Sequence, residues 1–102
     1  MKIVKVTYTT KAEYSEKNQN NIKHVMNDLQ NINNKNINYN SCIGADKKTF
    51  IHTAFFKTEE DEKVLLGLES FKIFQEQLKA SGPEVSSKQE ILNLVGTSKE
   101  IF

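Results

Sequence analysis

The chain has 102 residues, a length typical of one domain, spanning residues 1–102, with its own hydrophobic core. Its 14 basic and 13 acidic residues nearly balance, so no strong field steers it to nucleic acid or to an anionic membrane. Every basic residue is a lysine, and without arginine there is no bidentate contact to phosphate or guanine. We therefore expect no nucleic-acid partner and, without a run of about 18 apolar residues, no membrane partner.

Cysteine usage points to a compartment. The one cysteine, Cys42, cannot form a disulfide within the chain and fits a reducing environment. The first ten residues alternate polar and apolar side chains, which is unlike the continuous apolar region of a signal peptide. The expected location is cytoplasmic.

Hydrophobic periodicity divides the chain into six elements. Strict alternation predicts strands, and apolar residues at helical spacing predict helices. Thr58 followed by carboxylates is a good helix start, Gly67 is expected to interrupt that helix, and Gly82 with Pro83 ends it. The predicted elements are a strand at 2–10, a helix at 12–31, strands at 37–43 and 49–57, a helix at 58–82, and a strand at 88–96.

The order βαββαβ predicts an α+β, ferredoxin-like fold, with a four-stranded antiparallel sheet and two helices on one face. Asparagine recurs ten times between Asn18 and Asn40. This recurrence is read as compositional bias and not as a ladder of binding groups.

The two middle strands are predicted to form a hairpin whose turn centres near Asp46. That register places Asn40 opposite His52 and Cys42 opposite Phe50. The more apolar face is then expected to meet the helices, with Ile37, Tyr39, Ile43, Ile51 and Phe55 on it. The opposite face is expected to carry Thr7, Thr9, Asn40, Cys42, Phe50, His52, Phe56, Ile91 and Val95.

This second face mixes apolar and polar side chains, so it is too apolar for water and too polar for a dry core. A homodimer through facing sheets resolves both facts. The apolar residues would seal the interface, and the polar ones would line the remaining cavity.

The βαββαβ order, the short chain and the segment SFKIFQEQLKASGPE, with an LNLVG strand after it, resemble the dimeric α+β barrel superfamily, antibiotic biosynthesis monooxygenase-like. The resemblance covers nearly the whole chain and rests on topology and a loose pattern. It implies a dimeric α+β barrel, with a pocket between sheet and helices. Activities in this group include cofactor-free oxygenation of quinol-like aromatics and haem degradation.

The resemblance to haem-degrading members fails at three positions. Those members use an Asn on the first strand, a Trp on the third strand and a His on the second helix. Here the matching regions offer Thr7, no Trp anywhere in the chain, and Gln75. These departures argue against haem, and no flavin or nicotinamide motif is present, so no cofactor is expected.

His52 is the candidate catalytic residue, because an imidazole in a semi-polar cavity can act as a general base or orient a phenol. The alternative is a strand histidine that is hydrogen-bonded to Asn40 and has no chemistry. Cys42 has no second thiol or basic partner and is expected to be a filler. No pair of residues has metal-ligand spacing, so no metal site is expected.

The sequence thus predicts a homodimer that binds a small apolar or aromatic molecule, with a cofactor-independent monooxygenase-like reaction as its enzymatic version. The expected ligand-binding residues are Thr7, Asn40, Cys42, His52, Phe56 and Phe74. The alternative function is a non-catalytic interaction or structural dimer. A connected cavity at Asn40, His52 and Phe56 favours ligand binding, whereas Phe50, Phe56 and Phe74 filling that space would favour the alternative.

Overall fold

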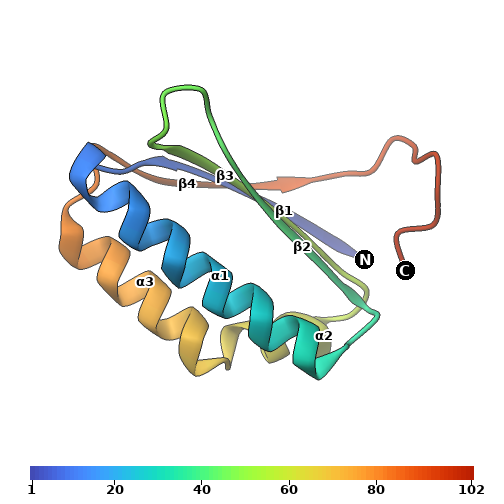
Figure 1. Ribbon diagram of the computed structural model, residues 1–102. Coiled ribbons are helices and arrows are strands. Elements are labelled where there is room, and N and C mark those ends of the chain that lie inside the picture. The colour runs from blue at the N-terminus through green and yellow to red at the C-terminus, as the bar shows by residue number, and fades with distance from the viewer.

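The computed structural model describes residues 1–102 as one antiparallel sheet with all its helices on one face (Figure 1). The strands stand in the spatial order β2-β3-β1-β4. This is the predicted ferredoxin-like α+β fold. The elements are β1 (Lys2–Thr9), a 3-10 turn η1 (Ala12–Tyr14), α1 (Ser15–Ile32), β2 (Ile37–Ile43), β3 (Thr49–Phe56), α2 (Glu59–Leu66), α3 (Glu69–Ser81) and β4 (Val85–Leu92).

The second predicted helix is two helices, α2 and α3, because the chain breaks at Gly67. Thr58 caps α2 in a capping box, in which its side chain accepts from the Asp61 amide and Asp61 accepts from the Thr58 amide. Gly82 ends α3 in the left-handed region at φ 68°, where a side chain would be strained. The predicted start and both glycine positions are confirmed.

The β2–β3 turn centres between Asp46 and Lys47 and not on Asp46, and this shifts the register by one residue. Gly44 donates its amide to the Thr49 carbonyl, Lys47 takes a left-handed φ of 64°, and Asp46 accepts from the amides of Lys48 and Thr49. His52 therefore lies opposite Ser41 and not Asn40. Since side chains alternate along a strand, this one-residue slip turns over the whole of β3.

The predicted faces are thus right for β1 and β2 and wrong for β3. Phe50, His52, Ala54 and Phe56 face the helices and are buried, whereas Ile51 and Phe55 face away from them. The helix-facing side chains of β1 and β3 pack with α1, α2 and α3 in one core of Val4, Tyr8, Ile22, Val25, Phe50, Ala54, Phe56, Leu65, Phe71, Phe74 and Leu78.

The last strand is β4 at Val85–Leu92 and not residues 88–96. Its pairing with β1 ends where Leu92 meets Ile3, one residue from the start of β1 at Lys2. Ile91 pairs with Val4 and so lies on the helix side of the sheet, contrary to the prediction, and Val95 lies beyond the strand. Two β4 residues, Ser86 and Ser87, oppose Tyr8 alone in a bulge.

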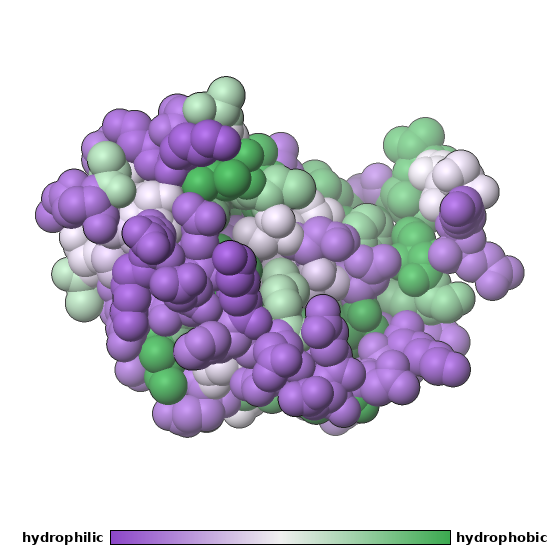
Figure 2. Space-filling view, in the orientation of Figure 1, coloured by the Kyte–Doolittle hydropathy of each residue, from purple (hydrophilic) through white to green (hydrophobic).

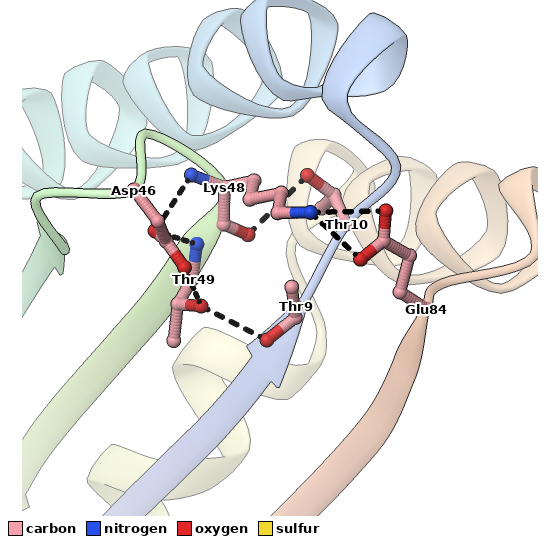
Figure 3. A network of polar contacts seen from close by, with 6 residues as sticks. All are labelled: Thr9, Thr10, Asp46, Lys48, Thr49 and Glu84. Carbon is pink, nitrogen blue, oxygen red and sulfur yellow. Dashed lines mark hydrogen bonds and ion pairs between the residues drawn. The ribbon is translucent and has the colours of Figure 1, made fainter.

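Polar side chains join the turn to its neighbours at this end of the sheet (Figure 3). Thr49 donates its hydroxyl to Asp46 at 2.6 Å, and its oxygen lies 2.9 Å from the hydroxyl of Thr9 on β1. Lys48 forms an ion pair at 2.9 Å with Glu84, which precedes β4. We call these five residues the turn network. It ties β1, the β2–β3 turn and the approach to β4 together.

None of the helices combines the length and the apolar composition that crossing a lipid bilayer would need.

Candidate functional site

His52 stands in the middle of β3, on the face that the helices cover, and is 3 % exposed. Its Nε2 lies 2.7 Å from the Tyr8 hydroxyl of β1, and its Nδ1 lies 2.8 Å from the Tyr39 hydroxyl of β2. Both ring nitrogens are therefore paired with side chains from the neighbouring strands.

The chain of hydrogen bonds continues to α1. Asn18, which is fully buried, donates its Nδ2 to the Tyr8 hydroxyl at 2.8 Å, while its Oδ1 has no hydrogen-bond partner. We call Asn18, Tyr8, His52 and Tyr39 the buried network. Its members come from α1 and from three adjacent strands, so only the folded chain assembles it.

Burial governs the protonation of the buried network. Loss of water lowers the pKa of His52 to about 4, so the imidazole is neutral at neutral pH. Burial also raises the pKa of the Tyr8 and Tyr39 hydroxyls well above their usual range, which keeps both protonated. The buried network is thus an uncharged chain of hydrogen-bond donors and acceptors.

A cavity of about 560 Å³ opens between this network and α3. That volume lies within the range of small-molecule sites. Its aromatic and aliphatic wall includes Tyr8, Tyr39, His52, Phe71, Phe74 and Leu78. Gln75 and Lys79 of α3 and the bulged serines of β4 supply polar groups.

The aromatic rings of the wall are packed against one another. The rings of His52 and Phe74 are 5.5 Å apart between centroids, and those of Phe71 and Phe74 are 5.8 Å apart. Tyr8 stacks on His52 at 5.3 Å. A flat ligand can stack on these aromatic faces, and the polar atoms of the buried network lie beside them.

The structure brings two of the predicted site residues, His52 and Phe74, to the cavity. It separates them from Thr7, Asn40 and Cys42, which lie on the opposite face of the sheet and do not line the cavity. The prediction that these three share a site with His52 is wrong, because it rested on the slipped register of β3.

Phe56 is also misplaced by the prediction. It is 2 % exposed and pairs with Lys2 and Ile37 at the far end of β3, within the core and away from the cavity. The hydrogen bond from His52 to Asn40, which was the alternative to a catalytic His52, does not form either, since the imidazole lies on the other side of the sheet from Asn40.

Sequence reasoning missed Tyr8, Tyr39 and Asn18. Tyr39 is predicted to face the helices, and Tyr8 does so too because it alternates with Thr7 and Thr9 on β1. A buried tyrosine hydroxyl needs a partner, which was the available signal. Asn18 is the first of the ten asparagines between residues 18 and 40, and this run hid it. Nothing in the local sequence distinguishes it from the exposed ones.

Cys42 is an exposed free thiol. No three His, Cys, Asp or Glu side chains come together in an arrangement able to hold a metal ion.

No family model matches the sequence, and no curated protein matches it. Solved structures do match the fold along nearly its whole length. One is described as a candidate antibiotic biosynthesis monooxygenase from Nitrosomonas europaea. It has a TM-score of 0.76 at 16 % identity, and the match covers 94 % of this chain and 100 % of that one. A similarly described protein from Bacteroides thetaiotaomicron has a TM-score of 0.82 at 8 % identity, covering 97 % and 93 %.

A mutant of SnoaB, a cofactor-independent oxygenase from Streptomyces nogalater, has a TM-score of 0.67 at 11 % identity and covers 97 % of this chain and 96 % of its own. At these identities the likeness concerns the fold. The chain shares the fold of these proteins, in agreement with the resemblance noted in its sequence.

Proposed function

We propose that this protein binds a small apolar or aromatic molecule in the cavity between the sheet and α3. The observation that carries the proposal is the cavity itself, about 560 Å³ with a mostly apolar, aromatic wall and a buried polar network on one side. Of the three phenylalanines whose packing into such a space would favour a non-catalytic dimer, only Phe74 lines it. The open space supports ligand binding, although of the predicted lining residues Asn40, His52 and Phe56 only His52 is part of it.

The enzymatic version of the proposal is a cofactor-independent monooxygenase-like reaction. One atom of O₂ would enter the substrate and the other would leave as water, with the substrate itself supplying the electrons and both hydrogens. The fold shared with a cofactor-independent oxygenase supports this version. The lone cysteine fits a cytoplasmic setting.

The catalytic role proposed for His52 needs to be restated in the light of its contacts. Both ring nitrogens are engaged by tyrosines, so the imidazole has no free atom for a substrate. We therefore propose that His52 acts through Tyr39, and that the tyrosine hydroxyl makes the contact with the ligand.

Tetralin, a small apolar bicycle, tests binding directly. We expect an NMR titration to shift the side-chain signals of His52 and Phe74, and not the side-chain signals of Thr7, Asn40 and Cys42 on the opposite face of the sheet. Native mass spectrometry of the untreated protein would also reveal a co-purifying ligand as added mass.

Two α3 variants provide the matched comparison. Gln75→Trp places an indole at the cavity, whereas Glu76→Trp places one on the same helix outside it. Tetralin binding should be lost in the first and kept in the second. Binding that survives Gln75→Trp unchanged, or shifts confined to the outer face, would contradict the proposal.

We also propose a homodimer through the sheet face that the helices leave open (Figure 1). The corrected register places Ile51 and Phe55 there, beside Asn40 and Cys42. Ile51 is 37 % exposed, so an apolar side chain faces water in a single chain. Hydrophobic residues also gather around the C-terminal tail (Figure 2), where Leu94 and Val95 are exposed.

Native mass spectrometry also tests the dimer. Ile51→Lys would place a charge in the interface and should give a monomer. Ile73→Lys is the matched control, because Ile73 is 38 % exposed but lies on α3, on the other side of the molecule. A wild-type monomer, or equal effects of the two changes, would rule out this interface.

A further inference from the structure

The hydrogen bonds of the buried network run in one direction, in which each group donates to the next from Asn18 to Tyr39. This direction follows from the number of hydrogens that each group can donate. The Nδ2 group of Asn18 can only donate, so the Tyr8 oxygen accepts from it. The single Tyr8 hydrogen must then go elsewhere, and His52 Nε2, 2.7 Å away, is the other partner of that oxygen. Tyr8 is 1 % exposed, so water does not compete for this hydrogen.

The imidazole of His52 continues the same direction of donation toward Tyr39 and the cavity. A neutral histidine carries one N–H, and since Nε2 accepts from Tyr8, that hydrogen is on Nδ1. Nδ1 therefore donates to the Tyr39 oxygen, 2.8 Å away. The Tyr39 hydroxyl is left with a hydrogen that has no acceptor in the protein.

The reverse direction is disfavoured by where it would leave the unused hydrogen. If Tyr39 donated to His52, and His52 to Tyr8, the Tyr8 hydrogen would be unpaired in the core beside another donor, Asn18. A buried donor without a partner is costly. Both tyrosines line the cavity, but Tyr8 is buried and Tyr39 is half-buried. The forward direction therefore leaves the unused hydrogen on the more accessible hydroxyl.

We propose that Asn18 keeps the Tyr8 hydrogen on His52, so that Tyr39 presents its hydroxyl hydrogen to a carbonyl or phenolate oxygen of the ligand. This rests on the proposed binding function and narrows its ligand to an aromatic molecule that carries an oxygen acceptor. Tyr39 contacts the ligand, whereas Asn18, Tyr8 and His52 are positioning residues.

The surroundings of Tyr39 suit such a ligand. Its ring meets Phe71 edge-on at 6.5 Å, and Phe71 packs against Phe74. Rings of a bound molecule can lie against these phenylalanines while its oxygen reaches the hydroxyl. Burial raises the pKa of Tyr39, which keeps the donated hydrogen in place at neutral pH.

The tautomer of His52 tests the direction without any ligand. We expect nitrogen-15 NMR at neutral pH to show His52 with its hydrogen on Nδ1. His24, the other histidine, is exposed and serves as the internal reference. Hydrogen on Nε2, or rapid exchange between the two forms, would overturn the inference.

Asn18→Asp tests the positioning role. A carboxylate accepts where the amide donates, so Tyr8 should turn to it and His52 should change to the Nε2–H form. A merely structural Asn18 would leave the tautomer unchanged in the folded variant, and that result would remove its role. If the variant does not fold, the His52 tautomer in the wild type still tests the direction of the hydrogen bonds, and Tyr39→Phe still tests the donor.

Two matched probes test the donor. Tetralin and α-tetralone share one skeleton and differ by a carbonyl oxygen. Tyr39→Phe should weaken α-tetralone binding by about fivefold to tenfold, the worth of one hydrogen bond, and leave tetralin binding unchanged. Tyr14→Phe removes a hydroxyl outside the cavity and should change neither.

Failure of the donor role of Tyr39 can be distinguished from failure of the proposed binding function. Equal losses for both probes in Tyr39→Phe, or none for either, would overturn the donor role while the binding function stands. If neither probe binds the wild type, the binding function and the ligand part of the inference both fail. The tautomer then still decides whether the direction of the network is right.

Discussion

The buried network and the turn network use similar hydrogen bonds at different depths. Tyr8 and His52 are joined at 2.7 Å, and Thr49 and Asp46 at 2.6 Å. Tyr8 and His52 are at most 3 % exposed, whereas the ion-paired side chains of Lys48 and Glu84 are 33 % and 43 % exposed.

Water access leaves the turn network charged, whereas its absence keeps the buried network neutral. In the turn network, hydrogen bonds from Thr49 and from the Lys48 amide lower the pKa of Asp46 to about 2, and the contact with Glu84 raises the pKa of Lys48. Both groups are stabilised in their charged forms. In the buried network, desolvation lowers the pKa of His52, and the imidazole stays neutral. Burial, more than bond length, decides what each network contributes.

The largest expected effect is a pH dependence that comes from the buried network. The pKa of His52 is about 4 in the folded protein and about 6.5 when unfolded, so below pH 6.5 the unfolded chain binds the extra proton. The free energy of unfolding should therefore fall by about 3 kcal/mol between pH 6.5 and 4. Urea unfolding at several pH values would measure it.

Two variants isolate that slope. His52→Gln should lose it, and His24→Gln should keep it, because His24 is exposed. The turn network does not interfere, since a carboxylate with a lowered pKa, such as Asp46, loses its stabilisation only as the pH falls below its unfolded value of 3.8. Parallel slopes in wild type and His52→Gln would contradict a neutral buried imidazole.

A middle effect is expected for Tyr8→Phe. This change removes the hydroxyl that pairs two buried groups, Asn18 Nδ2 and His52 Nε2, and should cost about 1 to 3 kcal/mol of stability. Tyr14→Phe is the control, because the Tyr14 hydroxyl has no partner to lose. Similar costs for the two changes would mean that the hydrogen bonds of the buried network add nothing.

The smallest effect is expected in the turn network. Lys48→Ala should destabilise the protein less than Tyr8→Phe does, because solvent screens the pair with Glu84. A double-mutant cycle with Glu84→Ala should give a coupling that disappears in concentrated salt. A coupling that persists in salt, or exceeds the cost of Tyr8→Phe, would erase the contrast between the two networks.

Much of the fold could be predicted because its signals are local. Alternation in β1 and β2, the Thr58 cap and the glycines at 67 and 82 each depend on residues a few positions apart. These signals suffice for the βαββαβ order. That order, the short chain and the segment SFKIFQEQLKASGPE together carry the resemblance to the antibiotic biosynthesis monooxygenase-like superfamily. The candidate site was predicted only at His52 and Phe74, since its other members come together through strand pairing.

By itself the sequence determined the elements, their order and the inner faces of β1 and β2, because period and capping are properties of neighbouring residues. Only the tertiary structure decided which face of β3 is inside. Asp46 and the left-handed Lys47 close a turn that centres between these two residues and not on Asp46, and a register shift of one residue is enough to invert a strand. That turn brings His52 between Tyr8 and Tyr39, and burial there makes the imidazole neutral.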